Sequence, residues 1–284
     1  MTAQHTNRTR RFYNSNTTLF LRFGHSSQGS IHRAVWADSV KTRQAALHHV
    51  DDLLCQQIMS CSQADEPQVL DLGCGVGASL SYMAQRLPIR GTGITISEHQ
   101  QALALKRFRA QEQQQRLSCI QTDFCQLPDD LEQADLVFAI ESFVHAADAE
   151  AFFREAARHM KPGARLVICD DFLNPTQAER DAQSHAWLER FRQGWLIGSL
   201  LSPQHADAIA KEHQLRLLEQ LDLSPFLELG RPRDRSIAII LKILGKLALL
   251  SNYGKMLSGG NALQTCLQNE WLKYCFLVWE KTDG

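Results

Sequence analysis

The sequence predicts an α/β protein built on a doubly wound, largely parallel sheet of about seven strands. Short β-rich runs alternate with longer helical patterns from Val69 onward, and a glycine-rich turn follows the first run. The length of 284 residues suits one elaborated domain. We therefore expect one core with an N-terminal helical cover and an inserted helical lid.

The elements of this core follow in a regular order. Short runs of branched and aromatic residues predict strands at 69–72, 91–96, 117–121, 135–140 and 165–170. Apolar positions at helical spacing predict helices at 77–87, 98–115 and 149–160. The last of these helices should stop at Lys161-Pro162-Gly163, because proline and glycine both disrupt a helix.

The segments on either side of the core are expected to be mostly helical. Residues 30–59 have apolar positions three or four apart, with Ser30 as the N-cap, and should lie across the open end of the sheet. Residues 175–213 are predicted to be helical, and 215–229 and 274–281 to be two late strands around a further helical insertion. The expected boundaries are a cover at 1–60, a core at 61–174, and lid insertions with C-terminal strands at 175–284.

Charge and composition exclude several classes of protein. With 30 Lys and Arg against 31 Asp and Glu, the net charge of −1 lacks the basic excess of a nucleic-acid-binding protein. Residues 1–16 are polar and basic with no apolar run behind them, so we expect a cytoplasmic protein without a signal or anchor. The eight cysteines include no C-x-x-C pair, so neither a zinc site nor a disulfide framework is expected.

The longest apolar stretch is residues 237–250. It is interrupted by Lys242, Gly245 and Lys246 and is shorter than the roughly 20 residues of a membrane-spanning helix. We interpret it first as a lid or dimer-forming helix, second as the wall of a lipophilic pocket, and third as a membrane-surface helix. The preceding R-P-R-D-R run at 231–235 is expected to be a solvated loop, with a second anion site as the alternative.

The strongest motif is V-L-D-L-G-C-G-V-G at 69–77, in which a buried strand runs into a glycine-rich turn and then a helix. Glycine lets the backbone approach a ligand closely, and the helix N-terminus adds unpaired N–H donors. A nucleoside-bearing cofactor fits such a turn. Asp71 would repel a pyrophosphate but suits a cofactor with an amino group and a sulfonium. The glycine spacing also differs from the dinucleotide fingerprint, so an NAD-dependent oxidoreductase is disfavoured.

This motif closely resembles the first motif of the class I S-adenosylmethionine-dependent methyltransferases, which have a Rossmann-like fold. The resemblance covers roughly residues 69–171. It implies that Gly73, Gly75 and Gly77 wrap the methionine part of S-adenosylmethionine, with Asp71 behind them.

The resemblance extends to the rest of the cofactor site. Thr95 stands where this family usually has an acidic residue for the ribose. The stretch G-I-T-I-S-E-H-Q, however, resembles cyclopropane-fatty-acid and related C-methyltransferases, which implies a ribose contact by Gln100. Ser97 would cap the following helix. Thr122-Asp123-Phe124 matches the adenine-binding turn of the family, which implies that Asp123 accepts a hydrogen bond from the adenine amine.

The end of the fourth predicted strand, F-A-I-E-S-F-V-H-A at 138–146, is the candidate catalytic segment. It resembles sterol and prenyl-diphosphate C-methyltransferases. Carboxyl ends of parallel strands bind ligands in open α/β sheets, so Glu141 and His145 should face the transferred methyl group. Methylation of an alkene leaves a carbocation, which Glu141 would stabilise and then deprotonate. His145 as the base would instead favour O- or N-methylation of a specialised metabolite.

The substrate site is expected to combine aromatic and cationic side chains. His32 and Arg33 would form a gate for an anionic, apolar substrate, a prenyl diphosphate being the first choice, and the diphosphate could bring Mg²⁺. Adjacent residues point apart, so His48-His49 and Asp170-Asp171 are not expected to bind metal. The aromatic candidates for stabilising the cation are Tyr13, Phe20, Trp36, Phe143 and Trp195. Homo-oligomerisation and a non-catalytic scaffold role stay open at this point.

Overall fold

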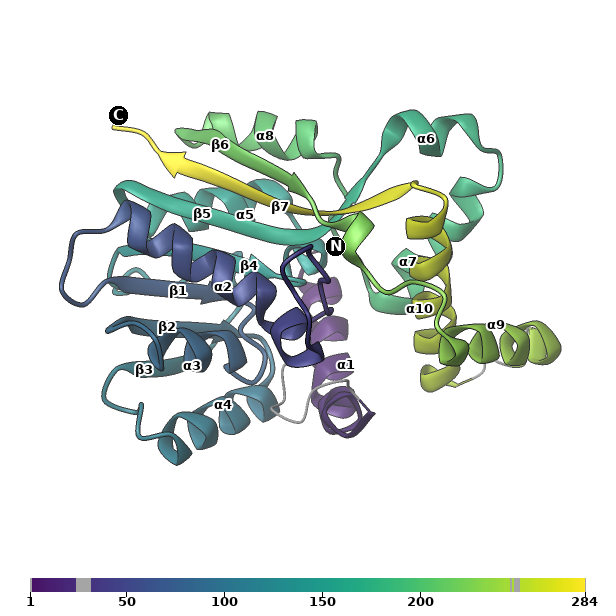
Figure 1. Cartoon of the computed structure of the whole chain (residues 1–284), viewed down its shortest axis with the longest axis horizontal. Helices are drawn as coiled ribbons and strands as arrows, with labels where there is room; N and C mark the ends of the chain where they lie inside the picture. Colours follow the sequence, from purple (N-terminus) through teal and green to yellow (C-terminus); the bar gives the residue numbers. More distant parts are fainter. Residues whose placement is uncertain (1, 24–31, 246, 248–250, 284) are drawn as a thin grey trace.

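The computed structural model describes residues 2–23, 32–245, 247 and 251–283. Its centre is a sheet of seven strands in the order β3-β2-β1-β4-β5-β7-β6 (Figure 1). The strands are β1 Gln68–Leu72, β2 Arg90–Thr95, β3 Leu117–Gln121, β4 Ala134–Ile140, β5 Met160–Leu173, β6 Leu215–Asp222 and β7 Leu272–Lys281. The first five run parallel, and β7 lies antiparallel between β5 and β6. The predicted doubly wound sheet is therefore confirmed.

Helices cover both faces and the open end of this sheet (Figure 1). They are α1 Thr2–Phe23, α2 Arg43–Cys61, α3 Ala78–Ala84, α4 Glu98–Ala110, α5 Ala149–Arg158, α6 Pro175–Arg180, α7 Ser184–Trp195, α8 Pro203–Glu212, α9 Pro232–Leu244 and α10 Asn252–Gln268. Two 3₁₀ turns, Phe143–His145 and Ser224–Phe226, follow β4 and β6. Among the helices that the structure describes, none has the length and apolar composition to cross a bilayer.

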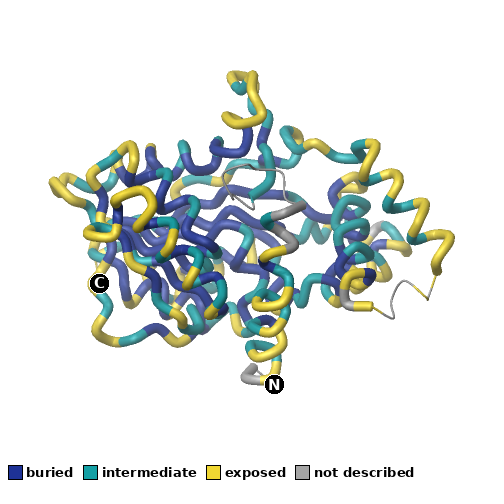
Figure 2. Tube along the Cα trace, turned by 90° about the horizontal axis from the view of Figure 1, so that it is seen from below, coloured by how far each residue is buried: buried dark blue, intermediate teal, exposed yellow. Residues whose placement is uncertain are grey.

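Successive side chains of the central strands point to opposite faces of the sheet, and this divides the core into two layers. In β4, Phe138 packs on the side of α2, α3 and α4, whereas Val137 and Ala139 pack on the side of α5 and α8. This is the burial on both faces expected for a parallel sheet with helices on each side. Figure 2 shows the buried strands in dark blue, with teal and yellow segments of intermediate and exposed residues around them.

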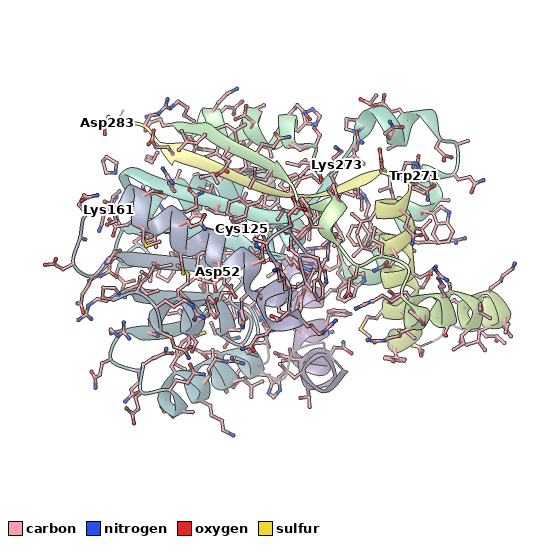
Figure 3. The ribbon with its side chains drawn as sticks, in the orientation of Figure 1. Asp52, Cys125, Lys161, Trp271, Lys273 and Asp283 are labelled. Carbon is pink, nitrogen blue, oxygen red and sulfur yellow. The ribbon has the colours of Figure 1, made fainter. Side chains whose placement is uncertain are left out.

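A third apolar cluster joins α7 and α10 beside the sheet. Their closest approach is at Gly194 and Gly259, where a Cβ on Gly194 would lie 2.5 Å from the Cα of Gly259. Trp271, labelled in Figure 3, is buried in the same cluster where α10 leads into β7. The helix pair is therefore fastened to the end of a core strand.

The N-terminal region differs from the prediction. The helix expected at 30–59 begins only at Arg43, because Thr42 is its N-cap and accepts a hydrogen bond from the Ala45 amide. The extended segment before it pairs with the chain after β6, through the bridge between Val35 and Leu227. Ser30 lies outside the described residues. The sequence analysis also missed α1, whose polar sequence gives no strong apolar stripe.

Three further boundaries were predicted wrongly. Helix α5 ends at Arg158, and Lys161-Pro162-Gly163 lies inside β5, where Gly163 takes a φ of +74° near a register shift against β4. Strand β6 ends at Asp222, whose side chain accepts from the amide of Ser224 and begins a turn. The R-P-R-D-R run is the first turn of α9 rather than a loop, because Pro232 suits the first helical position.

The eight cysteines are free thiols. Phe143, one of the aromatic candidates, is buried in the apolar core beneath the sheet's open end, beside Phe152 and Phe172. It is 1% exposed and does not line the cavity described below. The prediction that it faces the substrate is therefore wrong.

Candidate active site

A cavity of about 250 Å³ opens at the carboxyl ends of β1, β2, β4 and β5. One wall is formed by the loops after these strands, a second by α1, and a third by α7, Ile197 and α10. Most residues predicted for the site line it, namely Tyr13, His32, Arg33, Gly73, Gly75, Thr95, Gln100, Asp123, Phe124, Glu141, His145 and Trp195. Segments from the whole length of the chain thus meet at one place.

Among the predicted residues whose side chains are described, four do not line the cavity, namely Asp71, Gly77, Trp36 and Phe143. Asp71 lies in β1, and Gly77, the last glycine of the turn, is the N-cap of α3. The amide of Trp36 donates to the carbonyl of Phe226 beside the Val35–Leu227 bridge, so the predicted substrate contact of Trp36 has no support in this placement. Phe20 belongs to α1, but its side chain is outside the described part of the chain, so its role stays a prediction.

The three glycines of the turn have different surroundings. All have positive φ, at +99° for Gly73, +53° for Gly75 and +72° for Gly77. A Cβ on Gly73 would collide with Ser142, and one on Gly77 would lie 2.6 Å from the ring of Phe108. A Cβ on Gly75 meets nothing within 4 Å, so this glycine presents bare backbone to the cavity.

Asp71 is buried in β1 beside Gly93 of β2. Burial, together with the nearby Cys119 and Asp51, raises its pKa well above the usual range for a carboxyl group. The carboxyl group does not line the cavity, so its predicted place behind the cofactor stays a prediction.

The end of β2 places an amide at the cavity. Oγ1 of Thr95 donates to Oε1 of Gln100 over 2.8 Å, and Nε2 of Gln100 donates to Oγ1 of Thr17 over 3.2 Å. Ser97 caps α4 as predicted, since its Oγ accepts from the amide of Gln100. Thr95 thus fixes the oxygen of the Gln100 amide, and Thr17 of α1 fixes its nitrogen.

The turn after β3 places a carboxylate at the cavity. Oδ1 of Asp123 accepts from the amide of Cys125 over 2.9 Å, and Oδ2 accepts from Oγ1 of Thr6 over 3.1 Å. Phe124 packs edge-on against Phe152 of α5, with ring centroids 5.4 Å apart. The carboxylate therefore has a defined orientation next to an aromatic surface.

Glu141 follows β4 with an unusual backbone conformation, a φ of +51° that non-glycine residues adopt at a cost. Its amide donates to the carbonyl of Cys169, which holds this turn on β5. Oε1 accepts from the amide of Arg33 and from the hydroxyl of Tyr274, both over 2.9 Å. The carboxylate is thus held by two donors while it lines the cavity.

The two predicted gate residues are engaged with protein groups. Both terminal nitrogens of Arg33 donate to the carboxylate of Asp171 over 2.6 Å, and its guanidinium lies 4.6 Å from the ring centroid of Tyr274. Nε2 of His32 lies 2.9 Å from Oγ of Ser79, which itself donates to Asp51. The positive charge of Arg33 is therefore already balanced at this edge of the cavity.

His145 is half-buried and neutral. Its Nδ1 lies 3.4 Å from the carbonyl oxygen of Leu196, which can only accept, so the proton belongs on Nδ1. Nε2 then accepts from the hydroxyl of Tyr13 over 2.7 Å. Burial lowers the pKa of His145 to about 4, and it raises the pKa of Tyr13 far above its usual value. At neutral pH the uncharged imidazole therefore has one acceptor, Nε2, and the Tyr13 hydroxyl occupies it in this structure.

Two groups of site residues were missed by the sequence analysis. Thr6 and Thr9 of α1 line the cavity on the same helical face as Tyr13 and Thr17, and their spacing of three and four residues could have revealed this face. Asp170 also lines the cavity. It accepts from the amides of Val144 and Asp171, and burial raises its pKa well above the usual range.

The cavity has a polar half and an apolar half. The apolar half consists of Phe191, Trp195, Ile197, Leu263 and Val144. The polar half carries Glu141, Asp123, Asp170 and Asp171 against the single guanidinium of Arg33, counted over the described lining. Within the described part of the chain, no group of three or more His, Cys, Asp or Glu side chains has a metal-binding arrangement.

The residues present fit S-adenosylmethionine. Open space faces the backbone at Gly75, the oriented amide of Gln100 and the carboxylate of Asp123 line the same cavity, and the carboxyl groups of that cavity suit the positive charge of a sulfonium. Each of these groups would bind a different part of one elongated molecule.

Comparison with known proteins agrees with this fit. The model of a methyltransferase domain family matches residues 70–168. An O-methyltransferase of Pyrenophora dematioidea is 29% identical over 195 residues, which span 69% of this chain and 71% of the relative. The 27-O-demethylrifamycin SV methyltransferase of Amycolatopsis mediterranei is 32% identical over 164 residues, which span 58% of each chain.

Solved structures share the fold over nearly the whole chain. The [4+2]-cyclase SpnF superimposes with a TM-score of 0.76 at 19% identity, covering 98% of this chain and 97% of that protein. Geranyl diphosphate C-methyltransferase of Streptomyces coelicolor A3(2) gives 0.68 at 17% identity, covering 98% of both. At such identities the likeness concerns the fold alone. Together with the matched domain and the relatives in sequence, it identifies the protein as an S-adenosylmethionine-dependent methyltransferase of the class I fold.

Proposed function

We propose that the protein methylates a hydroxyl group of a small lipophilic metabolite and that His145 accepts the hydroxyl proton. The observation that carries this proposal is the neutral imidazole in the cavity, with Nε2 as an acceptor 2.7 Å from the hydroxyl of Tyr13. A substrate hydroxyl that takes the place of this tyrosine hydroxyl would donate to the same lone pair.

The cofactor would lie along the glycine turn. We propose that Gly73 and Gly75 contact its methionine part, that Gln100 binds the ribose and that Asp123 accepts from the adenine amine, with Phe124 beside the ring. S-adenosylmethionine supplies the electrophilic methyl group when bound. Helix α1 would exclude water, because its side chains bridge Asp123, Gln100 and His145.

The substrate would lie against the apolar half of the cavity. Phe191 and Trp195 of α7 and Leu263 of α10 offer an aromatic and aliphatic surface without charge. Such a wall suits an apolar body of limited size, while the reacting hydroxyl points toward His145. We therefore propose that α7 and α10 determine which substrates are accepted.

The proton transfer follows from the chemistry of oxygen. As the new O–C bond forms, the electron pair of the breaking C–S bond passes to sulfur, and the oxygen would become a protonated ether. A protonated ether is a far stronger acid than an imidazolium, so even an imidazole with a low pKa takes the proton at Nε2. Holding the hydroxyl in line with the methyl group supplies much of the rate.

C-methylation of an isoprenoid, with Glu141 as the stabilising base, stays the second candidate. It is favoured by the position of the Glu141 carboxylate in the cavity, next to Tyr274. The pairing of Arg33 with Asp171 and the surplus of acidic groups make the cavity less suited to a diphosphate. The roles predicted for His32, Arg33 and Mg²⁺ in holding such a substrate have no support in these contacts.

One experiment separates the two candidates. The protein is incubated with S-adenosylmethionine, with and without Mg²⁺, and with a panel of phenols, alcohols and prenyl diphosphates, and products are identified by mass spectrometry. We expect O-methylated products that His145→Ala abolishes and Glu141→Gln only reduces. Methylation of a prenyl diphosphate on carbon, abolished by Glu141→Gln, would reverse the order of the candidates.

A further inference from the structure

Exposed apolar side chains gather on one part of the molecule. Eight large apolar side chains of the described chain are exposed, and six of them lie between residues 239 and 253. They are Ile239, Ile240, Ile243, Leu244, Leu247 and Tyr253, with Ile243 at 78% exposure and Leu247 at 69%. Scattered exposed apolar residues are normal, but a cluster of this kind marks a surface that binds something.

Four members of the cluster share one face of α9. Ile239 and Ile243 are spaced four residues apart, as are Ile240 and Leu244 beside them, whereas Leu247 lies beyond the C-cap Gly245. Helix α9 itself has no buried residue and packs on α10 at the edge of the fold. Figure 1 shows it projecting beyond α10, away from the sheet, and Figure 2 shows the same end largely in the colour of exposed residues.

The charges on this helix are mostly positive. Between residues 231 and 244 there are four cationic side chains, Arg231, Arg233, Arg235 and Lys242, and one acidic side chain, Asp234. Asp234 is neutralised locally, because its carboxylate accepts from the Nε and the amide of Arg231. The helix is thus cationic in a chain whose formal net charge is −1.

We propose that α9 docks the enzyme on an anionic lipid surface, with Ile239, Ile240, Ile243 and Leu244 in contact with the acyl chains near the headgroups. Apolar side chains and cations on one solvent-exposed helix match the two components of such a surface. A second copy of the chain matches it less well. A two-fold symmetric contact would place the cationic helices of both copies side by side, with no unpaired acidic side chain of α9 to balance them. The proposal does not depend on which substrate is methylated.

Co-sedimentation with vesicles tests this inference. We expect the protein to pellet with vesicles of phosphatidylcholine and phosphatidylglycerol, to pellet poorly with phosphatidylcholine alone, and to be released by salt. The double variant Ile240→Glu/Ile243→Glu should lower partitioning by at least about tenfold, since it places charges where apolar contact is proposed. The double variant Arg235→Glu/Lys242→Glu should lower it on anionic vesicles only.

The matched control is Met59→Glu, the same kind of change at a residue of α2 that is 56% exposed. It should pellet like the unchanged protein, and all variants should keep the melting temperature and the affinity for S-adenosylhomocysteine, because the altered side chains are exposed and lie outside the cavity. Absence of pelleting with anionic vesicles overturns the proposal, as does pelleting that Ile240→Glu/Ile243→Glu leaves unchanged. A dimer in light scattering that Ile240→Glu/Ile243→Glu disperses, without vesicle binding, would make the face a self-interface instead.

Discussion

The hydroxyl of Tyr13 lies 2.7 Å from Nε2 of His145, although 132 residues separate them in the chain. The rings also meet edge to face, with centroids 5.4 Å apart. Tyr13 belongs to α1, and His145 ends the short turn after β4. The N-terminal helix therefore delivers a side chain directly to the proposed base. Its contacts with Asp123 and Gln100 connect this position with the proposed cofactor site.

Replacement of Tyr13 by phenylalanine tests this relationship. The ring packing stays, but the hydroxyl that a substrate must displace from Nε2 of His145 is removed, so we expect kcat/KM to rise by roughly fivefold with the melting temperature little changed, since one hydrogen bond contributes only about 1 kcal/mol. Steady-state kinetics and a thermal melt measure both. A fall in kcat/KM would contradict displacement of the Tyr13 hydroxyl by the substrate.

Replacement of His145 by glutamine should remove most of the O-methylation rate, by roughly 10²–10⁴-fold, because the proton then lacks its acceptor. Binding of S-adenosylhomocysteine, measured by calorimetry, should stay within about threefold, since His145 is not among the proposed cofactor contacts. Loss of cofactor binding together with the rate would instead indicate that the cavity collapses without the imidazole.

The pH dependence of stability should carry the signature of a half-buried neutral histidine. The folded-state pKa of His145 is lowered to about 4 from an unfolded value near 6.5, so the unfolded chain binds more protons between these values. The contribution of His145 is present above pH 6.5 and is lost as the pH falls toward 4, by up to about 3 kcal/mol. Denaturant melts of the unchanged protein and of His145→Gln should diverge in this window.

The unchanged protein must be compared with His145→Gln because the pKa values of Asp170 and Asp71 affect the pH dependence of stability in the opposite direction to that of His145. Their raised pKa values favour the folded state at low pH, and they are present in both proteins. Parallel stability curves for the two proteins between pH 4 and 6.5 would contradict the assignment of a neutral, half-buried His145.

Two glycine variants should separate folding from cofactor binding. Gly75→Ala puts a methyl group into open cavity space at a φ of +53°, so we expect a stability loss of about 1 kcal/mol and a much larger loss of affinity for S-adenosylhomocysteine. Gly73→Ala collides with Ser142 and should mainly lower the melting temperature. Equal effects of both changes on affinity and stability would argue against a cofactor lying along Gly75.

The ion pair between Arg33 and Asp171 predicts that Arg33 contributes to the stability of the fold rather than to substrate binding. Arg33→Met leaves the carboxylate of Asp171, whose side chain is only 2% exposed, without its partner, and should destabilise the protein by about 3 kcal/mol. Adding Asp171→Asn should restore part of that loss, as measured in denaturant melts. If Arg33→Met leaves stability intact and raises only the KM of an anionic substrate, the gate function predicted from the sequence is right.

Local sequence determined the strand-turn-helix around Gly73, the cap at Ser97, and the succession of strands and helices along the core. These features depend on glycine conformation, side-chain capping and periodicity within a few residues, so they can be predicted from the chain alone. The likeness of V-L-D-L-G-C-G-V-G to a methyltransferase motif also belongs to this level, and the matched domain agrees with it.

Only the tertiary structure decided which side chains meet. The partners of Arg33 and Glu141 are Asp171 and Tyr274, which lie 138 and 133 residues away and follow no local pattern. Likewise, α1 escaped prediction because its polar face is stabilised by contacts with three loops of the sheet rather than by an apolar stripe of its own. Burial then set the charge of His145, because the cost of ionising an imidazole depends on the solvent it has lost, which no stretch of sequence specifies.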